Sequence, residues 1–355
     1  MSERFARATG TSSVGGAESH TSRSLTGLLG TIAGVGAILA LFPLWLGDSR
    51  VLMGVAILGL AYASYSIGFN LIFGSTGQLF LCVGALAGVG GFAAAILADR
   101  AGLPVLVGIL AGTALAGLTG GLLSWIAVRR SLGVIFTGIL TLIFALSFEN
   151  LLLGWSGMTG GDAGLQIASG SDTFLGERIP AFYLMLGLVL VFLLVHGLLR
   201  RSHFGWAFRA LRDDEVAAEL AGVNVARYRV YGALIGAAML GLAGSTYAFT
   251  AGRVSPTTFG FAQVDVVVIV MLAFGGIGTL HGPILGAVVF TAIDELLIEF
   301  GQLRLLAYGV LIIMLFLWIP RGVIATFGGL RRRPESLSSS RPDKTDAQTP
   351  STGPG

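Results

Sequence analysis

Six ionisable side chains lie within or beside apolar stretches long enough to cross a bilayer, where a charged group is costly and is a functional candidate. They are Glu149, His196, Asp265, Asp294, Glu295 and Glu299. Such groups could relay protons or cations. All except His196 fall toward the outer ends of their stretches, where headgroups would hydrate them or an external partner would contact them. His196 lies one turn before Arg200 and Arg201, which indicates a structural position at the inner interface.

Catalytic and metal-binding patterns are missing from the sequence. No HExxH, GxSxG or paired metal-ligand spacing occurs. A P-loop needs a lysine to reach nucleotide phosphates, and the only lysine is Lys344, which follows Pro342 and Asp343. The chain therefore cannot hydrolyse ATP by that machinery, and any ATP-driven step belongs to another subunit. Cys82 lies alone in an apolar stretch, so we expect a small buried side chain and no intrachain disulfide.

A charged segment, residues 209–230, separates two apolar stretches at 181–199 and 230–249. Val216, Leu220 and Val223, with Ala217 and Ala221 beside them, predict one narrow apolar stripe on a helix. Gly222 and Asn224 predict its end. Helices that lie on membranes favour a strongly basic polar face, whereas acidic residues here alternate with Arg209 and Arg212. They are Asp213, Asp214, Glu215 and Glu219. This mixture of charges favours docking on a partner protein over binding to the membrane surface.

The elements that must position these residues are membrane helices. The chain has 355 residues, of which 54% are hydrophobic and 12% charged, with a mean hydropathy of +0.84; soluble domains carry about 25% charged residues. A bilayer core needs about 20 apolar residues per helix. We therefore predict an all-α polytopic membrane protein, a bundle of about ten transmembrane helices. The predicted spans are 25–46, 51–73, 77–98, 103–128, 132–154, 181–199, 230–251, 263–280, 284–300 and 304–320.

The distribution of positive charge predicts the orientation, because lysine and arginine near span ends stay on the cytoplasmic side. With both termini cytoplasmic, 17 of the 22 lysines and arginines fall inside. The five outside are Arg50, Arg100, Arg178, Arg253 and Arg304. We thus expect a multi-pass protein of the inner (plasma) membrane. Its transmembrane domain would span 25–330, and we expect its tails, 1–24 and 331–355, to be disordered because of their composition. The first span lacks a tidy small-residue cleavage site, so we expect no removed signal peptide and a retained first span.

The 54 glycines predict close helix packing, because small residues let backbones touch within a membrane. Pairs four residues apart are Gly30 and Gly34, Gly84 and Gly88, Gly108 and Gly112, Gly117 and Gly121, and Gly232 and Gly236. Two denser clusters, GSTGQ and FGGIGTLHGPILGA, are either broken helices along a transport pathway or ordinary turns. TGGDAGL, residues 159–165, reads as a turn. The candidate pathway or hinge residues are Asn70, Gly74, Gly77, Gln78, Gly275, Gly276, Gly278, Gly282 and Pro283.

The charged segment carries a family resemblance. FGWAFRALRDDEVAAELAGVNVARYRV, residues 204–230, resembles the cytoplasmic coupling segment of LivM-type permeases, the branched-chain amino acid branch of ABC importers. Val216 stands where the widespread importer motif has Glu, as is common in this branch. Further matches are NLIFGSTGQL, LGVIFTGILTLIF, TGG followed by GL, SPTTFGF, and GGIGTLHGPILGA with Glu295 downstream. The resemblance covers roughly residues 50 to 320.

The resemblance implies a permease subunit that forms the translocation pathway for branched-chain amino acids or a related small polar solute. Its partners would be a second permease subunit, two cytoplasmic ATPase subunits that hold ATP and Mg, and an external solute-binding protein, with no nucleic acid. A cytoplasmic coupling helix between spans six and seven would dock in a groove of an ATPase. The residues that match the coupling motif are Gly205, Arg209, Arg212, Glu215, Ala217, Ala218 and Gly222.

One departure from the family pattern leaves the identity of the solute undecided. After Asn70 the family usually reads close to Gly-Tyr-Thr-Gly-Gln-Leu-Ser-Leu-Gly-His, whereas this chain has Ser75 for the Tyr and Phe80, Cys82 and Val83 in the later positions. Urea and short amides therefore remain alternatives to amino acids. An ion-driven secondary transporter is the alternative of another class, and it would need carboxylates deep within its spans. An intramembrane enzyme would need a convergent catalytic set that the sequence does not supply.

Overall fold

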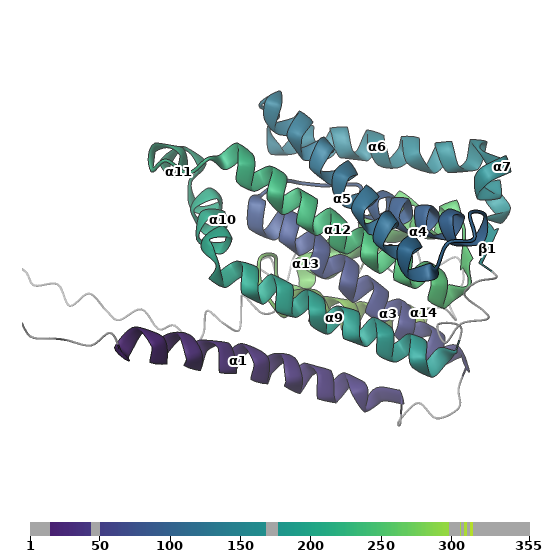
Figure 1. The fold of residues 1–355 in the computed structure, drawn as a ribbon, viewed down its shortest axis with the longest axis horizontal. Helices are drawn as coiled ribbons and strands as arrows, with labels where there is room; N and C mark the ends of the chain where they lie inside the picture. Colours follow the sequence, from purple (N-terminus) through teal and green to yellow (C-terminus); the bar gives the residue numbers. More distant parts are fainter. Residues whose placement is uncertain are drawn as a thin grey trace, which may run out of the picture.

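The computed structural model describes residues 15–43, 50–167 and 177–297, together with residues 306, 309, 310, 313 and 314. Nearly all of the described chain is helical, and the long helices run roughly along one direction (Figure 1). Five of them are long and apolar enough to cross a membrane, and three shorter apolar helices accompany them. The architecture of a polytopic helical bundle is therefore confirmed, while the count of ten spans stays a prediction.

The described part begins with α1 (Gly15–Ala40). It is followed by α3 (Arg50–Phe69), which continues into a π-helical turn, η1 (Asn70–Gly74). Next come α4 (Val83–Asp99), α5 (Val105–Arg129), α6 (Val134–Gly154), the short α7 (Ser156–Thr159), the 3-10 helix η2 (Gly161–Ala163) and strand β1 (Leu165–Gln166). Then follow α9 (Arg178–Arg201), α10 (His203–Asp213), α11 (Glu215–Leu220) and α12 (Val225–Ala251). The described part ends with β2 (Arg253–Val254), the 3-10 helix η4 (Pro256–Phe259), the π-helix η5 (Phe261–Asp265), α13 (Val266–Gly275) and α14 (Gly282–Leu297).

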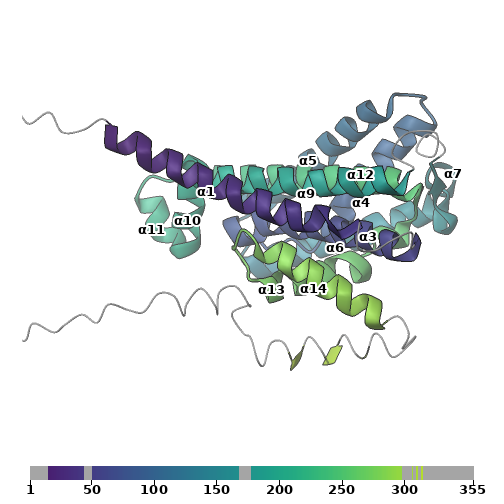
Figure 2. The same ribbon diagram turned by 90° about the horizontal axis from the view of Figure 1, so that it is seen from below.

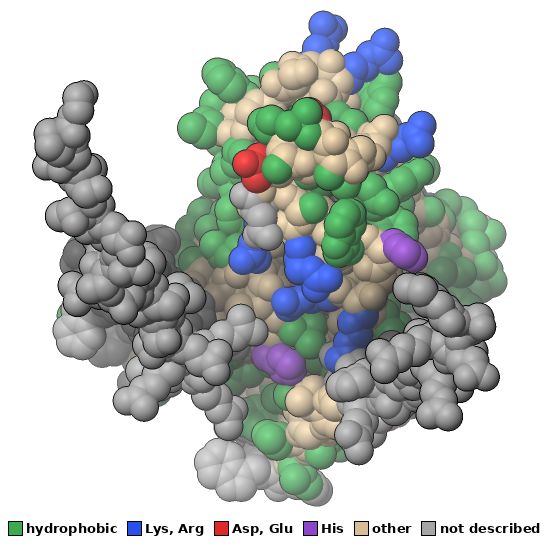
Figure 3. All heavy atoms as spheres, turned by 90° about the vertical axis from the view of Figure 1, so that its left-hand side faces the viewer, with side chains coloured by type: hydrophobic (Ala, Val, Ile, Leu, Met, Phe, Trp, Pro, Cys, Tyr) green, Lys and Arg blue, Asp and Glu red, His purple; other side chains and the backbone are tan. Residues whose placement is uncertain are grey.

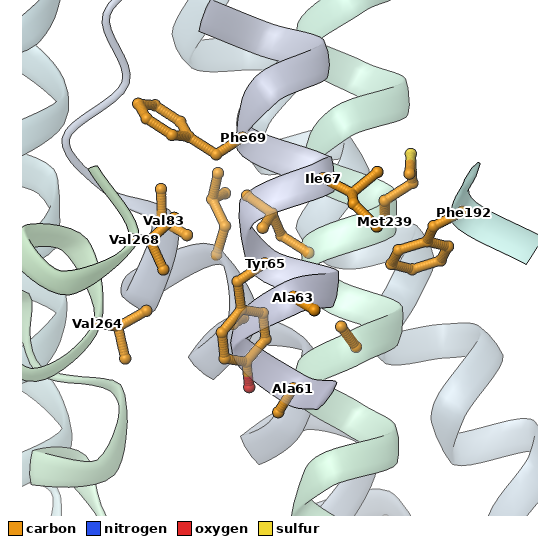
Figure 4. Close-up of a cluster of buried hydrophobic side chains, with 14 of the residues drawn as sticks. Ala61, Ala63, Tyr65, Ile67, Phe69, Val83, Phe192, Met239, Val264 and Val268 are labelled. Carbon is orange, nitrogen blue, oxygen red and sulfur yellow. The ribbon is translucent and has the colours of Figure 1, made fainter. Parts of the chain in front are cut away.

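Helix α3 lies at the centre of the buried core. Its side chains at every second position from Ala61 to Phe69 point into the surrounding helices (Figure 4). The neighbours in that view come from α4, α9, α12, η5 and α13: Val83, Phe192, Met239, Val264 and Val268. Because α3 is covered on several sides, it is apolar around most of its circumference, as expected of a helix in the middle of a bundle.

Glycines bring α4, α5 and α12 into backbone contact, as the sequence predicts. A methyl group on Gly90 of α4 would overlap the backbone of Gly241 in α12, and one on Gly112 of α5 would overlap the Gly90 carbonyl. Gly244 meets Ala87 in the same way. These contacts explain why such helices tolerate few larger residues at the crossing. Gly30 and Gly34 differ, because a methyl group there would meet no described atom within 4 Å.

Helix α1 lies on the outside of the bundle against α9, whereas α13 and α14 pack on the other side of α3 (Figure 2). The TGGDAGL segment forms turns, as predicted, and leads into β1. That strand pairs antiparallel with β2, with Leu165 opposite Val254 and Gln166 opposite Arg253. This pairing closes the end of the bundle opposite α10 and α11 (Figure 1).

Two predicted spans are wrong in part. Residues 77–82 of the predicted span 77–98 are not helical, and α4 begins only at Val83. Gly77 has a φ of +71°, which ends the preceding helix, and the Leu81 amide donates to Thr141 Oγ1 at 2.9 Å instead of to a helical carbonyl. The predicted span 263–280 ends as a helix at Gly275, because Gly276 has a φ of +110°.

Candidate functional site

The two glycine-rich clusters of the sequence meet at the buried side chain of Asn70. Its Nδ2 donates to the Thr279 carbonyl at 2.7 Å, and its Oδ1 accepts from the Gly278 amide at 2.7 Å. Asn70 itself has no solvent exposure. One amide side chain thus ties the π-helical end of α3 to the loop between α13 and α14, and we name this contact the Asn70 junction.

Close backbone approach explains the glycines at this junction. A methyl group on Gly74 would lie 2.8 Å from the Gly278 nitrogen, and one on Gly275 would overlap the Gly282 carbonyl. Gly278 has a φ of +75°, and a methyl group there would also overlap the guanidinium of Arg212. The loop is therefore held by backbone contacts that larger residues would break.

The predicted pathway or hinge residues separate into two places. Around the junction the structure brings together Asn70, Gly74, Gly275, Gly276, Gly278, Gly282 and Pro283, the last of these in the first turn of α14, where proline is tolerated. Gln78 lies apart from them, because its Oε1 accepts from Ser124 Oγ of α5 at 2.9 Å. Gly77, beside it, lines the same cavity as Gln78. Their roles in transport stay predictions.

The charged segment is two helices rather than the single helix predicted over 209–222. α10 ends at Asp213, and Asp214 takes an extended conformation with φ −159° and ψ 114°. Its Oδ1 accepts from the amides of Val216 and Ala217 at 2.9 and 3.1 Å, so Asp214 is the N-cap of α11. An aspartate cap inside the acidic run interrupts the helix, which the charge pattern alone does not reveal.

The predicted apolar stripe of this segment is also wrong in part. Val223 is buried, but Val216 is 66% exposed and Leu220 is 86% exposed. The segment instead has a small core of its own: Ala207, Leu211, Ala218, Val223 and Val225. Of the two alanines in the motif, Ala218 faces this core and Ala217 is exposed. The exposed apolar face of α11 is thus presented away from the bundle.

Ion pairing attaches α11 to α12. Arg229 Nη1 and Nη2 donate to Glu215 Oε1 and Oε2 at 2.6 and 2.9 Å, a bidentate pair with the Arg229 side chain 19% exposed. Among the other motif residues, Arg209 is exposed and Gly205 packs against the backbone of Arg200. Gly222 ends the segment with a φ of +84°, as the sequence predicts, and Asn224 then caps α12 by accepting from the Arg227 amide at 3.0 Å.

Basic side chains gather at this end of the bundle (Figure 3). The arginines at this end are Arg129, Arg130, Arg200, Arg201, Arg209, Arg212, Arg227 and Arg229. Burial, and after it the charge of Arg200, lowers the pKa of His281 below its usual range, so this loop histidine is largely neutral at pH 7. At the opposite end lie Arg100, Arg178 and Arg253. The described residues thus share the charge asymmetry from which we predict the orientation.

The prediction that headgroups hydrate Asp265 is wrong. Asp265 has no solvent exposure, and its carboxylate accepts from the Val83 amide at 2.5 Å and from the Gly84 amide at 3.1 Å. Cys82, which precedes α4, is fully buried and offers no side-chain cap, so Asp265 replaces the missing cap from 182 residues away in sequence. The absence of Ser, Thr, Asp or Asn before α4 was the only signal in the sequence for such a cap.

The remaining ionisable candidates do not converge on one site. Glu149, Asp294 and Glu295 are half-buried, and His196 is 1% exposed within α9, consistent with a structural role. Glu299 lies outside the described residues. Within the part of the chain that the structure describes, no group of three His, Cys, Asp or Glu side chains could hold a metal ion.

Comparison with known proteins supports one family. The family model described as "Branched-chain amino acid transport system / permease component" matches residues 51–319. The high-affinity branched-chain amino acid permease LivM of Escherichia coli K12 is 30% identical over 302 residues, which is 78% of this chain and 70% of that protein. LivM of Salmonella typhimurium LT2 is 31% identical over 305 residues, with the same coverage.

Other relatives carry other solute names. The fructose import permease FrcC of Rhizobium meliloti is 27% identical over 248 residues, 67% of each chain. The autoinducer 2 import permease LsrC of Enterobacter sp. 638 is 30% identical over 277 residues, 74% of this chain and 78% of that protein. No solved structure gives a significant match.

Proposed function

The chain belongs to the family of branched-chain amino acid transport system permease components, and from that premise we propose how its described elements couple transport to ATP hydrolysis. It is a permease subunit of an ABC importer and not an enzyme, because the ATPase of such importers is a separate subunit. The resemblance found in the sequence is therefore confirmed at the level of the family.

The solute we propose is a branched-chain amino acid or a related small polar molecule. Two LivM proteins that match most of the chain support an amino acid. The fructose import permease and the autoinducer 2 import permease among the relatives support a related small polar solute as the alternative. Urea and short amides stay alternatives, because the segment after Asn70 departs from the usual family pattern at Ser75, Phe80 and Cys82.

Permeases of this family generally work with a second permease subunit, ATPases and an external binding protein. For this chain we propose the full set of partners: one further permease, two cytoplasmic ATPases that hold ATP and Mg, and a solute-binding protein outside. We also propose ten spans with both termini in the cytoplasm, which places α10 and α11 on the cytoplasmic side. The cluster of arginines at that end supports this orientation.

The coupling mechanism rests on one observation: Arg212 of α10 lies against Gly278 of the Asn70 junction. In α11, which follows α10, Val216 and Leu220 are exposed and offer an apolar face for a groove of an ATPase. In α10, the guanidinium of Arg212 contacts the loop that Asn70 ties to α3. Movement of α10 and α11 by the ATPase would therefore reach α3, α13 and α14 through direct contact, without passing through α12.

Substitution of the exposed face tests this proposal. Leu220→Asp should leave the permease inserted and folded, since the side chain is 86% exposed, but should prevent docking of the ATPase. We expect loss of ATPase co-purification and of ATP-driven leucine uptake in proteoliposomes. Leu103→Asp, in the loop at the opposite end, is the matched control and should retain both. Full uptake by Leu220→Asp would exclude α11 as the docking element.

A further inference from the structure

A separate cavity of about 330 Å³ lies at the α10–α11 end of the bundle. Four segments that are distant in sequence line it. They are residues 77–78 after η1, residues 127–137 around the turn from α5 to α6, Glu215 and Glu219 of α11, and residues 225–229 at the start of α12. The family assignment gives this cavity no role.

One residue of the cavity lining favours a positively charged ligand. Glu219 is exposed and forms no ion pair within the described residues, whereas Glu215 is already neutralised by Arg229. A free carboxylate of this kind suits an ammonium group.

A second part of the cavity lining, the start of α6, favours a negatively charged ligand. Gly133 and Val134 line the cavity at the start of α6, a helix of 21 residues whose N-cap, Gly133, supplies no side-chain hydrogen bond. The first-turn amides of such a helix lack intrahelical partners and carry the positive end of the dipole. A carboxylate is the group that such amides bind well.

Two buried polar groups have donors to spare. Gln78 is 5% exposed and lines the cavity; Ser124 donates to its Oε1, and its amide nitrogen donates to no described residue. Arg229 Nε is buried and has no hydrogen-bond partner. Because an unsatisfied buried donor is costly, Arg229 Nε favours a ligand with an acceptor oxygen, and the Gln78 amide can donate to the same ligand. Leu132 and Val225 add apolar surface for a side chain.

We propose that this cavity binds a free α-amino acid as a zwitterion on the cytoplasmic side, with its ammonium at Glu219 and its carboxylate at the start of α6. The proposal rests on the proposed function, which supplies the orientation and the solute class. An amino acid in this position bridges α11 to the turn between α5 and α6. It restrains the coupling segment, so transport slows as the solute accumulates inside.

The first test uses the whole importer complex in lipid nanodiscs without its external binding protein, and measures binding by calorimetry. L-leucine should bind. 4-Methylpentanoate, which lacks the ammonium, and 3-methylbutylamine, which lacks the carboxylate, should each bind about tenfold or more weakly, because each loses one charge-assisted interaction. No leucine binding, or equal binding of the three compounds, would overturn the proposal.

A variant assigns the ammonium contact. Glu219→Gln should weaken leucine binding about tenfold and leave 4-methylpentanoate binding unchanged, because only leucine has the ammonium group that Glu219 contacts. Glu177→Gln, an exposed glutamate at the opposite end before α9, is the matched control and should bind leucine like the unmodified complex. Unchanged leucine affinity in Glu219→Gln would overturn the assignment.

Uptake separates this inference from the proposed function. In proteoliposomes with the binding protein outside, leucine loaded inside should slow ATP-driven leucine uptake by the unmodified complex and slow it less in Glu219→Gln. Absence of leucine uptake without internal leucine would refute the proposed solute alone. Normal uptake with equal inhibition in both complexes would refute the regulatory cavity alone.

Discussion

At the scale of single residues, Arg212 and Asn70 both contact the loop between α13 and α14, Arg212 from α10 and Asn70 from η1. Asn70 uses its donor and its acceptor together, on Thr279 and Gly278, because its amide group carries both an NH₂ donor and a carbonyl acceptor. Arg212 contacts the same loop through Gly278. Arg212 and Gly278 are in direct contact, so we expect substitutions at these two positions to have interdependent effects.

A double-mutant cycle measures that interdependence. Gly278→Ala should reduce the solute moved per ATP hydrolysed, because the new methyl group overlaps Arg212 and a φ of +75° strains alanine. Arg212→Ala should also reduce it, because the contact is removed. The double variant should be less impaired than the two single effects predict, since the overlap is gone. Strictly additive effects in proteoliposomes would show that the contact does not transmit movement.

The pair of Glu215 and Arg229 gives a second prediction at this scale. Glu215→Arg should detach α11 from α12, because it replaces a bidentate ion pair with like charges. The exchange Glu215→Arg with Arg229→Glu should restore much of the uptake. Recovery is measured as ATP-driven uptake at equal amounts of inserted protein. If the exchange stays as inactive as the single variant, Glu215 acts on a partner rather than on Arg229.

At the scale of elements, the interrupted helices are stabilised in the same way, by side chains from other helices. η1, residues 77–82 and the loop after α13 leave backbone groups without helical partners inside the bundle, where each must find another partner. Thr141, Asn70 and Asp265 supply those partners from other helices. Helices that depend on such distant caps are held in position by tertiary contacts rather than by their own sequence.

Asp265 is the strongest case, and its substitution tests the idea. Asp265→Ala removes both acceptors at the start of α4 and should lower the unfolding free energy by about 2 kcal/mol. Asp265→Asn should cost less, because the amide oxygen still accepts. Thermal unfolding in detergent and hydrogen exchange at Val83 and Gly84 are the measurements. Asp162→Ala, exposed in η2, is the control, and equal stability of both alanine variants would contradict the capping role.

At the scale of the whole molecule, the ends of the bundle differ in charge and in construction. The arginine-rich end carries α10 and α11, whereas the other end is closed by α7 and the β1–β2 pair (Figures 1 and 3). With the proposed orientation, the first end meets the ATPases and the second meets the binding protein. The arginines lie at one end because positive residues near span ends stay on the cytoplasmic side when the chain inserts into the membrane, and not because of packing within the fold.

Labelling in intact cells checks this orientation. Cys82 is the only cysteine, so Cys82→Ala gives a background without thiols. In that background, Asp162→Cys should react with a membrane-impermeant maleimide added outside, and Leu220→Cys should react only after the membrane is opened. External labelling of Leu220→Cys would invalidate both the orientation and the coupling proposal.

Nucleotide binding by the isolated subunit provides a last prediction. Because the only lysine is Lys344, we expect the purified chain to bind no ATP and to hydrolyse none, as measured by calorimetry and phosphate release. The assembled complex with its ATPases is the positive control. Hydrolysis by the permease alone, at a level above that of a mock purification, would contradict this.

The sequence alone determined the membrane class, the positions of the five long apolar helices and the family, because these depend on apolar length and local motifs. It also located the end of the coupling segment at Gly222, since a left-handed residue requires glycine there. The tertiary structure alone decided that Asn70 meets Gly278, that Asp265 caps α4 and that Arg229 holds Glu215. Each of these bonds joins residues that are far apart in the chain or in different helices, and a local pattern contains no information about which helices become neighbours.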